Sequence, residues 1–179
     1  VPGAGAGEAV CGVLKETVGA AGALDMRCYM TDHRQGSKAH DNTPVTEADI
    51  AVNDLLHARL GGARPDYGWL SEETEDDSSR LTQPRVWVVD PIDGTRAFAK
   101  GRPHFAISVA LVEGGRPVLG VIFNPATDEF FEARFGGGAF LNGKPIRVAD
   151  CTAIEGCRMV AFAPMFKHPS WPEPWPEMD

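Results

Sequence analysis

The sequence predicts an α+β fold in which two long helices pack on a large antiparallel sheet. Two observations lead to this prediction. Apolar residues recur at helical spacing in two segments of the amino-terminal third, over residues 8–29 and 46–60. From residue 86 onward the pattern changes to short β-type runs separated by glycine- and asparagine-containing turns, which is typical of a meander of antiparallel strands.

The first helix is expected over residues 8–29. Its apolar positions repeat every three or four residues and predict one buried face, although three glycines within it lower its intrinsic helix propensity. A polar loop from Asp32 to Pro44 follows it. The predicted buried positions are Val10, Val13, Leu14, Val18, Ala21, Leu24 and Cys28.

The second helix is expected to begin at Thr46 and to end at Leu60, because Gly61 and Gly62 follow. Thr46 and Asp49 stand at a spacing close to that of a capping box. Asp49 could therefore cap this helix or turn toward a functional site. The predicted inward residues are Ile50, Val52, Leu55, Leu56 and Leu60.

Short β-type runs account for the predicted sheet. Residues 67–71 form an apolar run before an acidic loop, and residues 86–89 form a denser run that ends at Asp90-Pro91. Further strands are expected over residues 105–112, 117–124, 129–134 and 146–148, with turns at Gly114-Gly115, Asn124-Pro125, Gly136 to Gly138 and Asn142-Gly143.

Composition excludes several functional classes. The 179 residues contain 25 Asp and Glu against 17 Lys and Arg, a net charge of −8, and no basic cluster. Nucleic-acid polymers and anionic membranes are bound through such clusters, so neither is expected as a partner. No apolar run approaches the ~18 residues of a membrane-spanning helix. The four cysteines have neither zinc-site nor disulfide-scaffold spacing, which favours reduced thiols and a cytoplasmic location.

One main domain with two short ends is expected. Residues 1–7 begin without Met and lack a signal-peptide pattern, so they are expected to be disordered or derived from cloning. Residues 8–163 would form the α+β unit. Residues 164–179 are rich in proline and tryptophan and do not resemble the end of a finished domain.

The strongest functional signal is the segment from Asp90 to Thr95, Asp-Pro-Ile-Asp-Gly-Thr. The bend at Pro91 can aim two carboxylates and the Ile92 carbonyl at one point, and hard divalent cations prefer such oxygen ligands. Gly94 lets a ligand approach the backbone, and a helix that begins near Thr95 could offer amides to phosphate. A plain Pro-Asp-Gly turn between strands is the alternative.

Two further acidic segments favour the metal-site interpretation. Glu72 comes directly after the run at residues 67–71, and neighbouring strands that end on the same side would bring it beside Asp90. Asp49 supplies a third carboxylate if it turns away from its capping role. Residues 75–77 are interpreted as a solvated acidic loop.

Three motifs together resemble those of the inositol monophosphatase superfamily: Pro-Val-Thr-Glu-Ala-Asp at 44–49, Ser-Glu-Glu at 71–73 and Asp-Pro-Ile-Asp-Gly-Thr at 90–95. That superfamily includes inositol monophosphatases, fructose bisphosphatases and 3'(2'),5'-bisphosphate nucleotidases. The resemblance covers about residues 8–148 and implies the amino-terminal part of a layered αβαβα sugar-phosphatase-like fold. It also implies that the carboxyl-terminal α/β subdomain, with a downstream Trp-Asp segment that supplies a metal ligand, is missing from these 179 residues.

The resemblance implies a Mg²⁺-dependent phosphomonoesterase with the following metal ligands. Glu72 and Asp90 would hold the first ion together with the Ile92 carbonyl. Asp90 would bridge to a second ion that Asp93 also binds. Asp49 would assist the attacking water or hold a weaker third ion.

The resemblance also implies residues that face the substrate. Gly94 and Thr95 would offer backbone amides to the phosphate, and the Thr95 hydroxyl, with Glu72 and Asp49, would take part in catalysis by orienting the water. Glu73 would support the metal ligands from behind. Arg96 and Lys38 are candidate specificity residues, with ordinary solvated side chains as the alternative.

Arg96 and the stretch at 67–73 look closer to the bacterial nucleotidase branch, which favours the 3'-phosphate of 3'-phosphoadenosine 5'-phosphate as the bond that is hydrolysed. The alternative substrate is inositol 1-phosphate or a related sugar phosphate. By resemblance we also expect a homodimer and inhibition by lithium. A hypothesis of another class is a truncated, non-catalytic fragment that binds metal or a partner subunit, because the downstream Asp is absent.

Overall fold

The computed structural model describes residues 4–29, 36–37, 44–45, 47–150, 152–153 and 156. Residues 1–146 make up one compact unit, and residues 147–179 make up a second. Among the described residues of the second unit there is no helix or strand. The predicted boundary at residue 163 and the tail at 164–179 lie outside the described residues, so both stay predictions.

The first unit consists of two long helices and a seven-stranded sheet with the strand order β3-β4-β5-β6-β7-β8-β9. The long helices are α1 (Ala4–Cys28) and α2 (Glu47–Ala63). The strands of the sheet are β3 (Gly68–Ser71), β4 (Arg85–Asp93), β5 (Ala106–Glu113), β6 (Arg116–Asn124), β7 (Glu129–Arg134), β8 (Gly138–Leu141) and β9 (Lys144–Ile146). The smaller elements are the strands β1 (Gly36–Ser37) and β2 (Pro44–Val45), the 3-10 helix η1 (Ser78–Thr82) and the short helix α3 (Thr95–Ala99).

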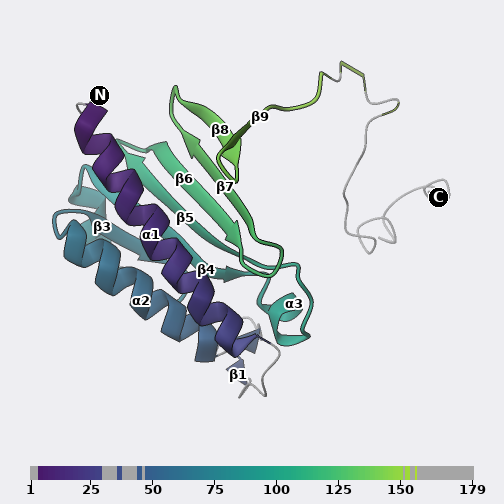
Figure 1. Ribbon diagram of the computed structural model, residues 1–179. Coiled ribbons are helices and arrows are strands. Elements are labelled where there is room, and N and C mark those ends of the chain that lie inside the picture. The colour runs from purple at the N-terminus through teal and green to yellow at the C-terminus, as the bar shows by residue number, and fades with distance from the viewer. Residues whose placement is uncertain are drawn as a thin grey trace, which may run out of the picture. The chain divides into compact units, whose positions relative to one another are not determined.

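The two long helices lie side by side across one face of the sheet (Figure 1). Their inward stripes meet the sheet in a continuous core. Fully buried members of this core include Leu14 and Val18 of α1, Leu56 of α2 and Ile107 of β5. The predicted α+β class is therefore confirmed, and burial of these apolar side chains supplies most of the free energy that holds the layers together.

The sheet is antiparallel from β4 to β9, whereas β3 pairs with β4 in parallel. The crossover between these two strands contains η1 and the acidic loop at residues 72–77. Because β3 and β4 run in the same direction, their carboxyl-terminal ends lie at the same edge of the sheet. The residues that follow them are thereby brought together.

The buried stripe of α2 differs from the predicted one. Ile50, predicted to face inward, is 50% exposed, whereas Asp49 and Asn53 are 2% and 5% exposed. Successive residues point about 100° apart around a helix, so a stripe that contains Val52 and Leu56 also contains positions 49 and 53 and leaves position 50 outside. The helix also continues through Gly61 and Gly62 to Ala63. Packing of the preceding turn in the core, where Leu60 is fully buried, outweighs the propensity cost of about 1 kcal/mol per glycine.

No helix in the described part of the chain is both long enough and apolar enough to cross a membrane.

Candidate functional site

The parallel pairing of β3 with β4 places Glu72 next to Asp90. Ser71 pairs with Val89 in the register of these strands, so the residues that follow them occupy equivalent positions at one edge of the sheet. The Glu72 amide continues the ladder by donating to the Val89 carbonyl at 3.4 Å. Two carboxylate-bearing residues from segments 18 positions apart in the sequence are thus adjacent. Their role as metal ligands stays a prediction.

β4 does not end at Asp90, as predicted, but continues to Asp93 through an irregularity. Asp90 pairs with Ser108 and Asp93 pairs with Ala106, so three steps along β4 match two along β5. One extra residue in a strand is a bulge, which bends the strand and re-aims its side chains. Pro91 has no amide to donate, which suits this interruption of the ladder.

A second, smaller hydrophobic cluster holds the bend in place. Ile92, Phe98 and Phe105 are 1%, 0% and 3% exposed and pack together. Phe98 and Phe105 meet edge to face, with 4.9 Å between their ring centroids. Asp90 is half-buried and Asp93 is exposed, so the bulge anchors the apolar Ile92 inward and leaves the carboxylate of Asp93 at the surface.

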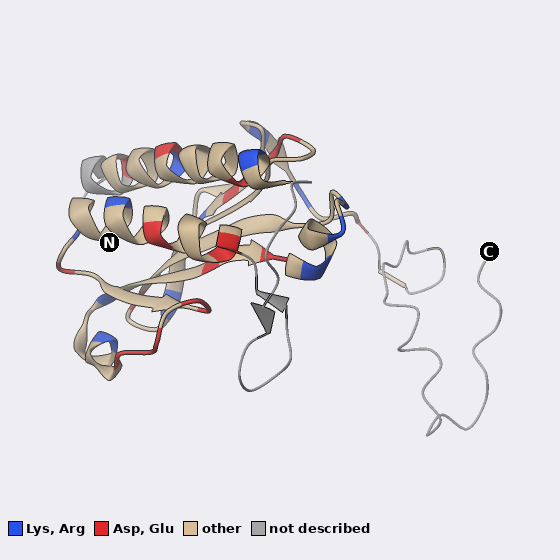
Figure 2. Ribbon diagram, turned by 90° about the horizontal axis from the view of Figure 1, so that it is seen from below, with Lys and Arg blue, Asp and Glu red and all other residues tan. Residues whose placement is uncertain are grey.

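Gly94 and Thr95 connect the bulge to α3. Gly94 has a φ of 91°, in the left-handed region, and caps the helix. The Thr95 hydroxyl donates to the Ile92 carbonyl at 3.1 Å. The first intrahelical bond runs from the Ala97 amide to the Gly94 carbonyl at 2.8 Å, so the amides of Thr95 and Arg96 precede it. Figure 2 shows acidic residues at the end of β4 and basic residues on the adjoining α3. A loop of this kind can present amides to an anion.

We expect Gly94→Ala to destabilise the fold by about 2 kcal/mol or more, since a left-handed conformation is strained for any residue with a side chain. A Cβ at this position would also lie 2.6 Å from the carbonyl oxygen of His104, which is backbone and cannot rotate away. Urea unfolding of the variant measures the loss. Gly120→Ala is the control because a Cβ there meets nothing within 4 Å; equal stability losses for both variants would contradict the prediction.

Asp49 lies in the first turn of α2, and a second buried acid, Asp25, lies near it in the last turn of α1. Asp25 is fully buried, and within the part of the chain that the structure describes neither of its carboxylate oxygens has a hydrogen-bond partner. Burial, with a smaller contribution from the charge of Asp49, raises the pKa of Asp25 to about 8. Sequence reasoning missed Asp25, although it lies one helical turn after Ala21 and so falls on the predicted buried stripe. Thr46, the expected cap, and Lys38 lie outside the described residues, so their roles stay predictions.

The residues at the β3–β4 edge fit Mg²⁺ in chemical type. Glu72, Asp90 and Asp93 offer carboxylate oxygens and Ile92 offers a carbonyl, and Mg²⁺ takes oxygen ligands while keeping several waters. The carbonyl of Ile92 accepts one hydrogen bond from Thr95 and has a second lone pair. Within the described ranges, no group of three or more Asp, Glu, His or Cys side chains forms a preformed metal site.

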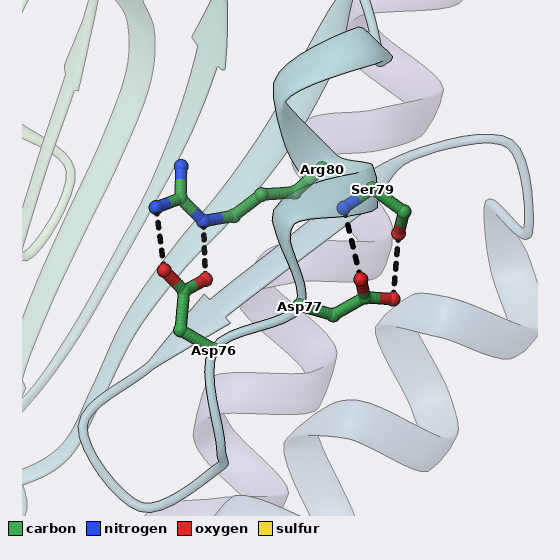
Figure 3. A network of polar contacts seen from close by, with 4 residues as sticks. All are labelled: Asp76, Asp77, Ser79 and Arg80. Atoms are coloured by element: carbon green, nitrogen blue, oxygen red, sulfur yellow. Dashed lines mark hydrogen bonds and ion pairs between the residues drawn. The ribbon is translucent and has the colours of Figure 1, made fainter.

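The acidic loop beyond Glu73 has a structural role (Figure 3). Asp76 forms a two-pronged ion pair with Arg80 at 2.6 and 2.8 Å, and Asp77 caps η1 by accepting from the amide and hydroxyl of Ser79 at 2.9 and 2.6 Å. An open pocket of about 370 Å³ next to this loop is lined by His57, Trp69 and neighbours, and contains no predicted site residue.

Comparison with known proteins identifies the chain as part of a phosphatase family. The family model described as the Inositol monophosphatase family matches residues 8–173, and the chain belongs to this family. It is 48% identical over 119 residues to an inositol-1-monophosphatase of Mesorhizobium japonicum, which covers 64% of the chain and 44% of that relative. It is 39% identical over 129 residues to a histidinol-phosphatase of Chlorobaculum parvum, covering 72% of the chain and 49% of the relative.

Solved structures agree with this assignment. The chain superimposes on an IMPase of Thermotoga maritima with a TM-score of 0.75 at 33% identity, over 84% of the chain and 60% of that structure. The named relatives are phosphatases, that is, phosphoric monoester hydrolases acting on small phosphorylated compounds. The chain spans less than half the length of the two curated relatives, 44% and 49%.

Proposed function

We propose that this chain belongs to a Mg²⁺-dependent phosphomonoesterase whose site is the edge formed by the ends of β3 and β4. The observation that carries the proposal is the parallel register, which places Glu72 beside Asp90 and follows Asp90 with the bulge that exposes Asp93. Membership of the inositol monophosphatase family supports it.

Two Mg²⁺ ions, or three if Asp49 holds one, would neutralise the substrate phosphate and lower the pKa of a bound water. Glu72, Asp90 and Asp93 supply the negative charge that holds the ions, and the Ile92 carbonyl supplies a neutral oxygen. Because Ile92 is packed in its own core, the carbonyl and the flanking carboxylates are held on a backbone that is fixed before ligands arrive.

The remaining residues act on the water and the phosphate. Thr95 offers its amide to a phosphate oxygen, and its hydroxyl, now bonded to the Ile92 carbonyl, lies where it can orient a water bound beside that carbonyl. Gly94 leaves its amide accessible because it carries no side chain. Asp49 is buried and accepts the proton that the water loses, and Glu73 supports Glu72 through the turn that the two residues share.

For the substrate we infer that inositol 1-phosphate is the better candidate, because a relative that is 48% identical carries that activity in its name. Histidinol phosphate is the second candidate, supported by a relative that matches more of the chain. The predicted 3'-phosphoadenosine 5'-phosphate rests on Arg96, an exposed residue of α3, and on sequence likeness at 67–73. None of the named relatives supports that branch.

We expect Mg²⁺-dependent phosphate release from one of these three substrates and none in the presence of EDTA. The assay uses the purified protein with each substrate at several Mg²⁺ concentrations, followed by lithium addition to the active pair. The substrate with the highest kcat/KM identifies the functional branch of the superfamily to which the enzyme belongs. If no phosphate is released from any of the three substrates at saturating Mg²⁺, the result would contradict the proposal and favour the hypothesis of a non-catalytic fragment. The expected homodimer is tested separately, by measuring the mass of the protein during size-exclusion chromatography.

A further inference from the structure

A buried amide on α2 holds the turn that carries Glu72. Asn53 is 5% exposed and lies one helical turn after Asp49. Its Oδ1 accepts the hydroxyl of Ser71 at 2.7 Å, and its Nδ2 donates to the Thr74 hydroxyl oxygen at 3.1 Å. The Thr74 hydroxyl also lies 3.4 Å from Oδ1. One side chain thus bonds both the first and the last residue of the segment 71–74.

The segment closes on itself as well. The Ser71 hydroxyl oxygen accepts the Glu73 amide at 3.2 Å, and the Thr74 amide reaches the Ser71 carbonyl at 3.5 Å. Ser71 is 6% exposed, so its hydroxyl links the buried Asn53 to a turn whose two middle residues are the exposed Glu72 and the half-buried Glu73. The Glu72 amide also bonds the Val89 carbonyl of β4 through a long 3.4 Å contact, which joins the turn to the strand that carries Asp90.

This arrangement matters because Glu72 is an exposed side chain on a turn. A glutamate carboxylate on a loose turn has to give up backbone and side-chain freedom when it binds a cation. In a turn that buried hydrogen bonds already hold, the backbone conformational entropy is lost on folding and not when the cation binds. The buried Asn53 amide cannot turn to water instead, so these bonds hold the turn in place.

We propose that Asn53 is a positioning residue for the metal site: by clamping Ser71 and Thr74 it keeps Glu72 beside Asp90 and so sets the affinity for divalent cations. The effect on cation affinity rests on the proposed function, whereas the hydrogen bonds from Asn53 to Ser71 and Thr74 do not depend on it. Groups that orient metal ligands typically contribute 10- to 100-fold to metal affinity.

Two readouts on the full chain test the proposal. Mn²⁺ binding is followed by electron paramagnetic resonance, and exchange of the Glu73 amide is followed by NMR. Asn53→Leu should bind Mn²⁺ about 10- to 100-fold more weakly and exchange the Glu73 amide faster. Asn53→Asp keeps an oxygen that accepts both hydroxyls and should retain most of the affinity. Thr17→Val, a buried polar residue of α1 away from the turn, should change neither readout.

Thr74→Val covers the case in which Asn53→Leu does not fold, because Thr74 is exposed and valine keeps its shape. Losing one of the two anchor points should weaken Mn²⁺ binding by a smaller factor, about 3- to 10-fold, and lower the thermal stability less than Asn53→Leu does. If the folded variants bind Mn²⁺ as tightly as the wild type does, the positioning role of Asn53 is overturned and the proposed function is not affected. A wild-type chain that binds no Mn²⁺ would contradict the proposed function, and an unchanged Glu73 exchange rate in Asn53→Leu or Thr74→Val would overturn the clamp whatever the metal result.

Discussion

Asp93→Asn should lower Mg²⁺-dependent kcat/KM by about 100-fold. The substitution keeps the size and shape of the side chain and removes its charge. Asp93 ends the bulge of β4 and is exposed, so it contributes nothing to the core and its replacement should leave the fold intact. The whole effect then falls on cation binding and on neutralisation of the phosphate.

The measurement is the initial rate of phosphate release as a function of Mg²⁺ concentration. Raising Mg²⁺ should recover part of the lost activity if the weakened site still fills. Glu75→Gln is the matched control, since it removes one negative charge from an exposed residue three positions beyond Glu72. Unchanged activity of Asp93→Asn, or an equal loss in Glu75→Gln, would show that the charge at position 93 has no specific role.

Much of the fold could be predicted from the sequence because its signals are local. The apolar repeats of α1 and the turn residues between β5, β6 and β7 specify elements within a few residues of their observed bounds. The deviations arise where packing outweighs local preference. α2 continues past Gly61 because the core holds its last turn, and β4 continues past Pro91 because a bulge accommodates a residue without an amide.

The site was only partly predictable for a related reason. The residue types at 72, 90 and 93 indicate an oxygen-ligand site, but their proximity depends on parallel pairing between β3 and β4, which no local pattern encodes. Asn53 and Asp25 were overlooked because a polar residue on an apolar stripe resembles an interruption of the pattern. The structure shows that such interruptions are informative: Asn53 bonds the turn beside the site, and Asp25 is a buried acid next to Asp49.

Asp25→Asn should stabilise the protein above neutral pH by a few kcal/mol. Neither carboxylate oxygen of Asp25 has a hydrogen-bond partner among the described residues, and burial, with a smaller contribution from the charge of Asp49, raises the pKa of Asp25 from 3.8 to about 8. The folded protein therefore binds the proton more tightly than the unfolded chain does. The stability that this proton contributes is fully present below pH 4 and is lost as the pH rises through about 8. Asparagine cannot ionise, so the variant escapes this loss.

Urea unfolding at intervals from pH 5 to pH 9, in the presence of EDTA so that no cation compensates the two acids, measures the effect. The difference in unfolding free energy between Asp25→Asn and the wild type should grow from pH 5 to about pH 8 and level off between pH 8 and pH 9, where Asp25 is ionised in both the folded and the unfolded state. Asp54→Asn, at an exposed position of α2, is the control and should give a flat difference. A difference that stays constant with pH would mean that Asp25 ionises equally easily in the folded and unfolded states. In that case solvent reaches the carboxylate in the folded protein, and the contact between the end of α1 and the start of α2 is looser than the full burial of Asp25 implies.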